Sequence, residues 1–213
     1  MKIIVFGATG DVGSRVVKEA FSRGHDVTAV VRNKHKAPLV PSETAVEVAE
    51  VSDTERIARI MAGHDLAVSA LRPPQGREAD LPALTEHILE AAARTTIRVL
   101  VVGGAATLKM PDGSGHTVLS APDFLPDDIR PIAEACRDQF DSCEREVRVD
   151  WTYFSPPAML TPGTRTGQYR RGSDILLVDA DGRSAISMED FAVAMLDQAE
   201  KPVADSRHIT VAY

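Results

Sequence analysis

The sequence of 213 residues predicts an α/β fold in which helices cover both faces of a parallel, doubly wound β-sheet. The apolar run at residues 3–6 leads through a glycine-rich turn into residues 14–23, whose apolar side chains recur at helical spacing. Short apolar runs and amphipathic segments then alternate as far as residue 102. Strands that are separated by helices pair in parallel. We therefore expect a single domain over residues 1–213.

The first half of the chain contains the regular part of this pattern. The third apolar run is followed by Ser-Asp-Thr-Glu at 52–55, which is typical of a helix N-cap with acids in the first turn, and Gly63 ends the helix that this segment opens. Pro73 and Pro74 exclude a helix directly after the fourth run. The expected strands are residues 3–6, 26–31, 45–51, 65–71 and 98–102, and the expected helices are residues 14–23, 54–61 and 81–95.

The second half is less regular. Residues 108–127 contain prolines, glycines and few periodic apolar residues, which predicts a long loop over the active-site cleft. Segments 104–130 and 155–190 are expected to form a small substrate-side region. The remaining expected elements are helices at residues 128–147 and 188–200 and strands at residues 151–154, 175–178 and 207–212.

A glycine fingerprint lies between the first strand and the first helix. Gly7 permits a tight turn, Gly10 lets the backbone approach a pyrophosphate, and Gly13 lets the helix pack closely against the strand. The free N–H groups of the helix N-terminus favour phosphate binding. This context predicts a Rossmann-type dinucleotide site, and the alternative is a glycine-rich turn that binds nothing.

The second strand indicates which dinucleotide is preferred. Sites that prefer NAD(H) carry an acidic residue at the end of this strand, whereas here the strand ends in Arg32, followed by Lys34 and Lys36. A guanidinium can bind a 2′-phosphate bidentately. The sequence therefore predicts NADP(H) over NAD(H), with a solvated basic loop as the alternative.

Composition excludes several classes of protein. The net charge of −7 argues against a nucleic-acid partner, and no apolar stretch approaches the roughly 20 residues that a membrane span needs. Cys136 and Cys143 lie seven residues apart in an expected helix, too far for an easy disulfide. We expect two reduced thiols in a cytoplasmic protein. No metal-ligand spacing occurs, and the six histidines are scattered.

Several motifs resemble those of one family over nearly the whole chain. They are GATGDVG at 7–13, VTAVVR at 27–32, VVGGAATL at 101–108, DWTYFSPPAML at 150–160 and the stretch from Arg165 to Leu196. Together they resemble the atypical short-chain dehydrogenase/reductases, and within them the NAD(P)H-binding, NmrA-like proteins, the NADH-flavin reductases and the flavin reductases of the biliverdin reductase B type. Members of this family are often monomers or dimers, so either state is expected here.

The resemblance implies a set of cofactor-binding positions at the carboxyl ends of the strands. Glu50 stands where relatives usually have an Asp against the adenine, so this residue departs from the family's pattern. Arg32 would meet the 2′-phosphate, and Lys36 would add a second cation. The implied cofactor-binding residues are Gly7, Thr9, Gly10, Asp11, Val12, Gly13, Arg32, Lys36, Glu50, Val51, Ala70, Leu71, Arg72, Gly103, Gly104, Ser155 and Pro156, with Ala105 and Pro157 beside them.

The acid–base pair of the typical short-chain dehydrogenases does not occur in this chain. Tyr153, Tyr169 and Tyr213 are its tyrosines, and none has a lysine four residues later. The histidine that biliverdin reductase B has after its Pro-Pro is Ala158 here. Hydride transfer to a flavin such as FMN, or to a quinone, needs little acid catalysis. It is therefore compatible with a chain that lacks both the Tyr-Lys pair and this histidine. Expected walls for such a planar acceptor are Arg72, Leu108, Phe124, Pro157 and Tyr169.

Three functions remain open on this evidence. The first is an NADPH-dependent reductase of a flavin, quinone or similar planar acceptor. The second is a non-catalytic NADP(H)-binding redox sensor that acts through a protein partner. The third is a reductase or isomerase of another small metabolite, with Ser114, Asp123 or Arg130 as conceivable proton donors. The catalytic residues stay unknown at this stage.

Overall fold

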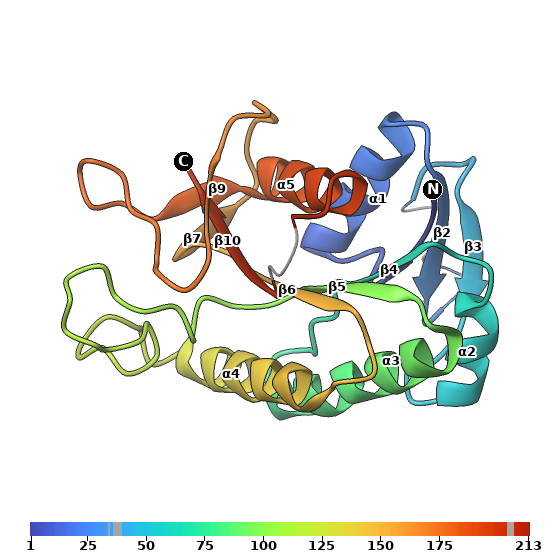
Figure 1. Cartoon of the computed structure of the whole chain (residues 1–213), viewed down its shortest axis with the longest axis horizontal. Coiled ribbons are helices and arrows are strands. Elements are labelled where there is room, and N and C mark those ends of the chain that lie inside the picture. Colours follow the sequence, from blue (N-terminus) through green and yellow to red (C-terminus); the bar gives the residue numbers. More distant parts are fainter. Residues whose placement is uncertain (34, 36–39, 204–206) are drawn as a thin grey trace.

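A computed structural model describes residues 1–33, 35, 40–203 and 207–213. Within these residues an eight-stranded sheet has the order β3-β2-β1-β4-β5-β6-β10-β8, and every pair is parallel except β10 with β8. A second sheet pairs β7 with β9 in parallel. The predicted α/β, doubly wound fold is confirmed (Figure 1).

The elements follow the sequence prediction closely. The strands are β1 (Lys2–Phe6), β2 (Asp26–Val31), β3 (Ala45–Val48), β4 (Leu66–Ser69), β5 (Arg98–Val102), β6 (Trp151–Ser155), β7 (Met159–Thr161), β8 (Arg170–Gly172), β9 (Ala185–Ser187) and β10 (His208–Ala212). The α-helices are α1 (Asp11–Ser22), α2 (Thr54–Met61), α3 (Leu81–Thr95), α4 (Arg130–Arg145) and α5 (Met188–Glu200).

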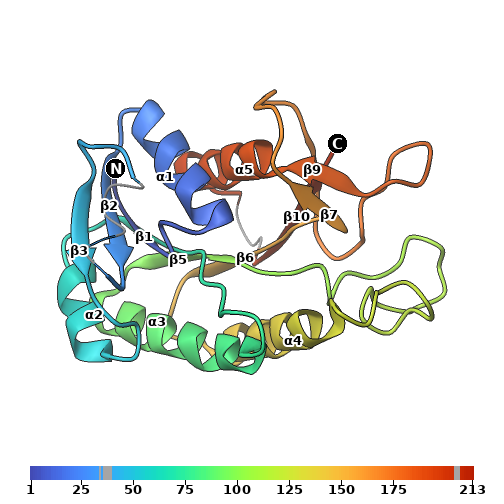
Figure 2. The same cartoon turned by 180° about the vertical axis from the view of Figure 1, so that it is seen from behind.

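Helices cover both faces of the sheet, with α1 and α5 on one face and α2, α3 and α4 on the other (Figures 1 and 2). On the first face, α1 and α5 lie side by side over an apolar cluster that includes Phe154 and Phe191. On the second face, α2, α3 and α4 pack in sequence over a cluster that includes Trp151 and Tyr153. Successive residues of a strand point to opposite faces, so β6 directs Tyr153 and Ser155 toward the α4 side.

One expected strand is wrong. Residues 175–178 do not form a strand, and Ile175 contributes only an isolated bridge to Lys109. The nearby sheet partner of β10 is β8, which lies in the polar, glycine-rich stretch where no strand was expected. Ile175 is 53% exposed and Leu176 is 2% exposed. The apolar run therefore reflects one buried side chain, Leu176, and its packing against Leu108 and Val118 in a satellite cluster.

Parts of the two segments expected on the substrate side lie together at one end of the molecule. Figures 1 and 2 show the chain between β5 and α4, and the loop between β8 and β9, beyond the start of α4 and far from β2 and β3. Lys109 joins the two segments, because its N–H donates to the Asp174 carbonyl over 2.7 Å and its carbonyl accepts from Leu176 N–H over 2.9 Å.

Candidate functional site

The two outer glycines of the loop after β1, Gly7 and Gly13, have no room for a side chain. Gly7 has a φ of +75°, and a Cβ there would lie 2.3 Å from the carbonyl oxygen of Ala70. A Cβ on Gly13 would lie 2.1 Å from the carbonyl oxygen of Gly7. The Gly10 N–H closes the turn by donating to Gly7 O over 2.9 Å. Both obstacles are backbone atoms that cannot move aside, so the two outer glycines are sterically required.

The N-terminus of α1 opens directly from this loop. Gly10 is the N-cap, and no side chain among the described residues caps the helix. The first N–H groups of a helix have no partner within it, and the helix dipole adds partial positive charge at the same place. Asp11, Val12 and Gly13 carry these groups, and Thr9 precedes them. A glycine-rich turn that leads into free amides fits the pyrophosphate of a dinucleotide.

Arg32 follows β2 directly and is exposed. None of the ion pairs among the described residues involves it. The next strand ends nearby, since Val31 pairs with Val48, and beyond it Glu50 is exposed and Val51 is buried. Lys36 lies outside the described residues. A cation and no acid therefore follow β2, as a 2′-phosphate requires.

Parallel register brings the other expected positions to the same edge of the sheet. Phe6 pairs with Ser69, and Ser69 pairs with Val101, so the residues after β1, β4 and β5 adjoin. The Ala70 N–H donates to Phe6 O over 2.9 Å. Leu71 packs into the α3–α4 side of the core, whereas Arg72 is exposed.

Tyr153 builds the turn after β5. A Cβ on Gly103 would lie 2.0 Å from the Tyr153 ring, and one on Gly104 would lie 2.7 Å from the Cys136 Sγ. The Tyr153 hydroxyl accepts from the Gly104 N–H over 3.2 Å, and it lies 2.9 Å from Cys136 O as a donor. Burial raises the pKa of Tyr153 well above its usual value. This phenol is a neutral support for the turn.

Ser155, at the end of β6, holds the other side of the same turn. Its Oγ donates to Gly104 O over 2.8 Å and lies 2.8 Å from the Nε2 of His208. His208 Nδ1 lies 3.2 Å from Asp174 Oδ1. Pro156 and Pro157 follow and are buried. His208 and Asp174 were not predicted as site residues, because β10 meets β6, and Asp174 meets His208, only in three dimensions.

The expected walls for a planar acceptor do not all converge. Leu108 is fully buried and supports its loop from beneath. Phe124 is 37% exposed in the segment before α4. The Tyr169 hydroxyl donates to Asp197 over 2.6 Å, and Asp197 also pairs with Arg23, just after α1 ends. The structure therefore places Tyr169 away from the glycine loop, and it leaves Arg72 exposed beside the loop.

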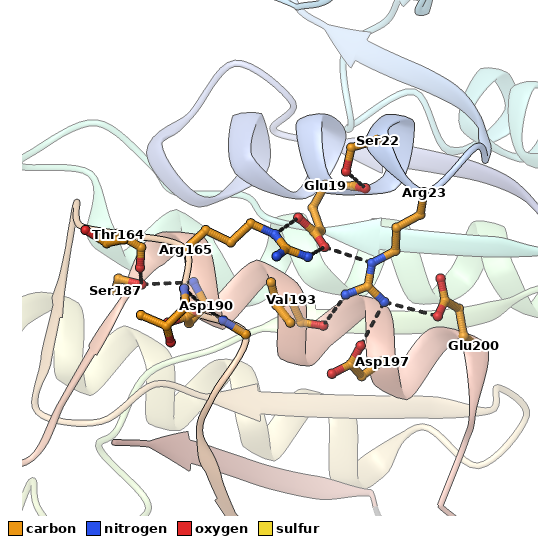
Figure 3. A network of polar contacts seen from close by, with 12 residues as sticks. Glu19, Ser22, Arg23, Thr164, Arg165, Ser187, Asp190, Val193, Asp197 and Glu200 are labelled. Atoms are coloured by element: carbon orange, nitrogen blue, oxygen red, sulfur yellow. Dashed lines mark hydrogen bonds and ion pairs between the residues drawn. The ribbon is translucent and has the colours of Figure 1, made fainter.

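An ionic network holds residues 162–169 across α1 and α5 (Figure 3). Glu19, whose side chain is 7% exposed, accepts from Arg165 over 2.8 Å and from Arg23 over 2.8 Å. Arg23 also reaches Asp197 over 2.8 Å and Glu200 over 3.1 Å. The Arg165 hydrogen bond, opposed by burial and aided by Arg23, lowers the pKa of Glu19. The carboxylate is therefore ionised at neutral pH.

The same segment is fixed a second time at the start of α5. Asp190 is fully buried and accepts from Thr166 N–H over 2.8 Å and from Gly167 N–H over 2.7 Å. The hydroxyls of Thr166 and Tyr213 donate to its other oxygen. Burial opposes ionisation here, but these hydrogen bonds outweigh it and lower the pKa of Asp190. Sequence inspection missed both networks.

The two cysteines are buried and unpaired, as expected. Burial raises the pKa of Cys136 to about 11, against the opposing charge of Arg72, and that of Cys143 to about 12. Both thiols are therefore protonated at neutral pH.

Among the described residues, none of the helices has the length and apolar character needed to span a bilayer.

Comparisons with known proteins agree with this geometry. The sequence profile of the NAD(P)H-binding family matches residues 7–202, from the first glycine of the loop to the end of α5. The chain belongs to the NAD(P)H-binding family. This NAD(P)H-binding protein is also 35% identical over 215 residues to the uncharacterized protein YwnB of Bacillus subtilis (strain 168), which covers 99% of this chain and 98% of that one.

Solved structures extend the comparison. A protein from Burkholderia pseudomallei named a putative exported protein is 37% identical, with a TM-score of 0.89 over 100% of both chains. A protein from Streptococcus pneumoniae TIGR4 named a putative NADH-flavin reductase is 29% identical, with a TM-score of 0.89 over 100% of this chain and 99% of that one. This NAD(P)H-binding protein is thus similar along its whole length to an oxidoreductase-like structure.

Proposed function

We propose that the protein is an NADPH-dependent reductase that passes a hydride to a flavin, a quinone or a similar planar acceptor. The observation that carries this proposal is the combination of the tightly packed glycine loop with the exposed Arg32 after β2, which has no ion-pair partner among the described residues. The loop suits any dinucleotide, whereas the guanidinium in place of an acid suits the 2′-phosphate of NADPH.

The residues of the chain bind and orient both reactants. The free amides of Asp11, Val12 and Gly13 would hold the pyrophosphate. Gly103 and Gly104, fixed by Tyr153 and Ser155, would line the nicotinamide, which supplies the hydride when bound. Arg72, exposed beside this turn, would attract an anionic group of the acceptor.

The choice of acceptor rests on the tyrosines and on one relative. Tyr153 is buried against α4, Tyr169 donates to Asp197, and Tyr213 donates toward Asp190. Each phenol is thus occupied by an internal partner and has no lysine four residues later. A flavin or quinone accepts hydride without a phenol donor, and the structural relative from S. pneumoniae carries the name of a flavin reductase.

The experiment is a set of turnover assays on the purified protein with FMN, riboflavin and a small quinone, each with NADPH and with NADH. The proposal predicts oxidation of NADPH by at least one acceptor, at a higher kcat/KM than with NADH. Tight NADPH binding with no oxidation by any acceptor would contradict it.

That contrary result would favour a redox sensor, the second function that the missing acid–base pair supports. A sensor must bind the reduced and oxidised cofactor with different affinities, because a ligand shifts a conformational equilibrium only by differential binding. Equal Kd values for NADPH and NADP⁺ would therefore exclude it.

We further propose a cytoplasmic location, which the two unpaired cysteines support, and a monomer or homodimer with no nucleic-acid or membrane partner.

A further inference from the structure

Ser155, His208 and Asp174 form a chain of contacts that ends on the turn after β5. Ser155 Oγ lies 2.8 Å from Gly104 O and 2.8 Å from His208 Nε2, and His208 Nδ1 lies 3.2 Å from Asp174 Oδ1. The inner end is buried, since Ser155 is 0% exposed. The outer end reaches solvent, since the Asp174 side chain is 61% exposed.

The three contacts can be satisfied together by only one protonation state. A carbonyl oxygen only accepts, so the single hydroxyl proton of Ser155 must go to Gly104 O. Ser155 Oγ then accepts from His208, which requires a proton on Nε2. The carboxylate of Asp174 also only accepts, which requires a second proton on Nδ1. All three contacts therefore need the doubly protonated imidazolium form of His208.

The surroundings of His208 oppose this form. Its side chain is 11% exposed, and it lies against the rings of Phe140 from α4, at 4.7 Å between centroids, and Tyr153 from β6, at 5.8 Å. Burial lowers the pKa of His208, and the charge of Asp174 opposes this only in part. Tyr153 is neutral, so Asp174 is the one charged group found to act on the ring among the described residues. A neutral His208 must give up either Asp174 or the donation of Ser155 to Gly104.

We propose that His208 is a positioning residue for the nicotinamide, and that its protonation commits the Ser155 hydroxyl to the Gly104 carbonyl and so fixes the turn. The proposal rests on the proposed function, because it takes Gly104 as the lining of the nicotinamide. Loss of the proton lets Ser155 turn toward Nε2 and releases that carbonyl, while the Gly104 N–H stays on Tyr153.

Asp174, at the solvent-exposed end of this series of contacts, connects His208 to the segments expected on the substrate side. The Asp174 carbonyl accepts from Lys109 N–H, and Lys109 belongs to the segment that follows the Gly103–Gly104 turn. The side chain of Asp174 thus contacts His208 of β10, while its backbone contacts Lys109 of the segment after β5. The protonation of His208 therefore depends on how the loop after β8 packs against the segment after β5.

The test is an NMR titration of the protein without cofactor, between pH 5 and 8, that follows the Gly104 carbonyl carbon, the Ala105 amide and the His208 ring. The proposal predicts one common midpoint for all three. In His208→Gln, whose side-chain amide still donates to Ser155 but does not titrate in this range, the Gly104 and Ala105 signals become independent of pH. A Gly104 titration that persists unchanged in His208→Gln would overturn the proposal.

A milder variant keeps the test valid if His208→Gln fails to fold. Asp174→Asn removes the charge that favours the imidazolium, so the common midpoint should move to lower pH. Asp181→Asn, in the next exposed turn with a side chain 72% exposed, is the matched control and should leave the midpoint in place. An equal midpoint in wild type and Asp174→Asn contradicts the proposal.

Saturating NADPH separates this inference from the proposed function. Linkage is reciprocal, so a cofactor that prefers the fixed turn raises the midpoint of the Gly104 titration. NADPH that binds without moving the midpoint overturns the positioning role and leaves the reductase proposal standing. A failure of NADPH to bind refutes the reductase proposal instead, while the titration without cofactor still reports on the His208–Ser155–Gly104 coupling.

Discussion

The two ends of α1 are built in opposite ways. At its N-terminus, Gly7 and Gly13 stand where a Cβ would meet backbone atoms. No side chain among the described residues caps the helix there, so its first amides stay free. At its C-terminal end Glu19 and Arg23 join α1 to α5 and to Arg165 through an ionic network centred on the buried Glu19. One end leaves hydrogen-bonding groups for a ligand, whereas the other uses them within the protein. Changes at the first should therefore alter binding, and changes at the second should alter stability alone.

The largest effect is expected from Gly13→Ala. The new Cβ would lie 2.1 Å from Gly7 O, and overpacking of this kind costs about 1–3 kcal/mol or more. We expect a large fall in the free energy of unfolding by urea and no detectable NADPH binding by calorimetry. Gly10→Ala is the matched control, because its Cβ would lie 3.3 Å from the same oxygen. Equal destabilisation by the two variants would show that the cradle is not sterically required.

Glu19→Gln tests the opposite end of the helix. Removing one charge of a buried pair costs about 3–5 kcal/mol, but Arg165 is 53% exposed, so we expect about 2 kcal/mol. The NADPH Kd should not change. Glu55→Gln is the matched control: its pair with Arg59 is exposed and worth about 0.2–1 kcal/mol at most. Weaker NADPH binding in Glu19→Gln would remove the separation between the two ends.

Two tyrosine variants sharpen the comparison further. Tyr153→Phe keeps the ring but leaves the Gly104 N–H without its acceptor, which costs about 1–3 kcal/mol. We expect lower stability and weaker NADPH binding from this variant. Tyr169→Phe, the control, removes a hydroxyl whose hydrogen-bond partner among the described residues is Asp197, and it should lower stability without changing the NADPH Kd. Urea unfolding and calorimetry on both proteins measure these effects.

The smallest effect is a dependence of stability on pH. The pKa of Glu19 is lowered in the folded state, chiefly by Arg165, so the unfolded state binds its proton at a higher pH. The stabilisation is complete above the unfolded value of 4.5 and is lost as pH falls toward the folded one. Urea unfolding between pH 6 and 3.5 should show a smaller loss in Glu19→Gln than in wild type. Parallel curves would contradict this assignment.

Local pattern explains what could be predicted from the sequence. Gly7, Gly10 and Gly13 lie together in one motif between a strand and a helix, and Arg32 follows its strand directly, so short stretches of sequence reveal them. Ser155 and His208 are 53 residues apart, and Arg165 and Glu19 are 146 residues apart. Pairs so distant become neighbours only through the order β6-β10-β8 and the packing of α1 on α5, which no local pattern encodes. The strand expected at 175–178 failed for the same reason, since β10 takes β8 as its partner instead.

The central claim is that the loop after β1 and Arg32 form an NADPH site, and calorimetric binding of NADPH and NADH to wild type and Arg32→Ala tests it most directly. A charge-assisted hydrogen bond contributes about 1.5–3 kcal/mol, so NADPH should bind Arg32→Ala about 10- to 100-fold more weakly, while NADH binding changes little. Arg59→Ala, whose side chain is 67% exposed on α2, should behave as wild type. Equal weakening of both cofactors in Arg32→Ala, or of neither, would contradict the account.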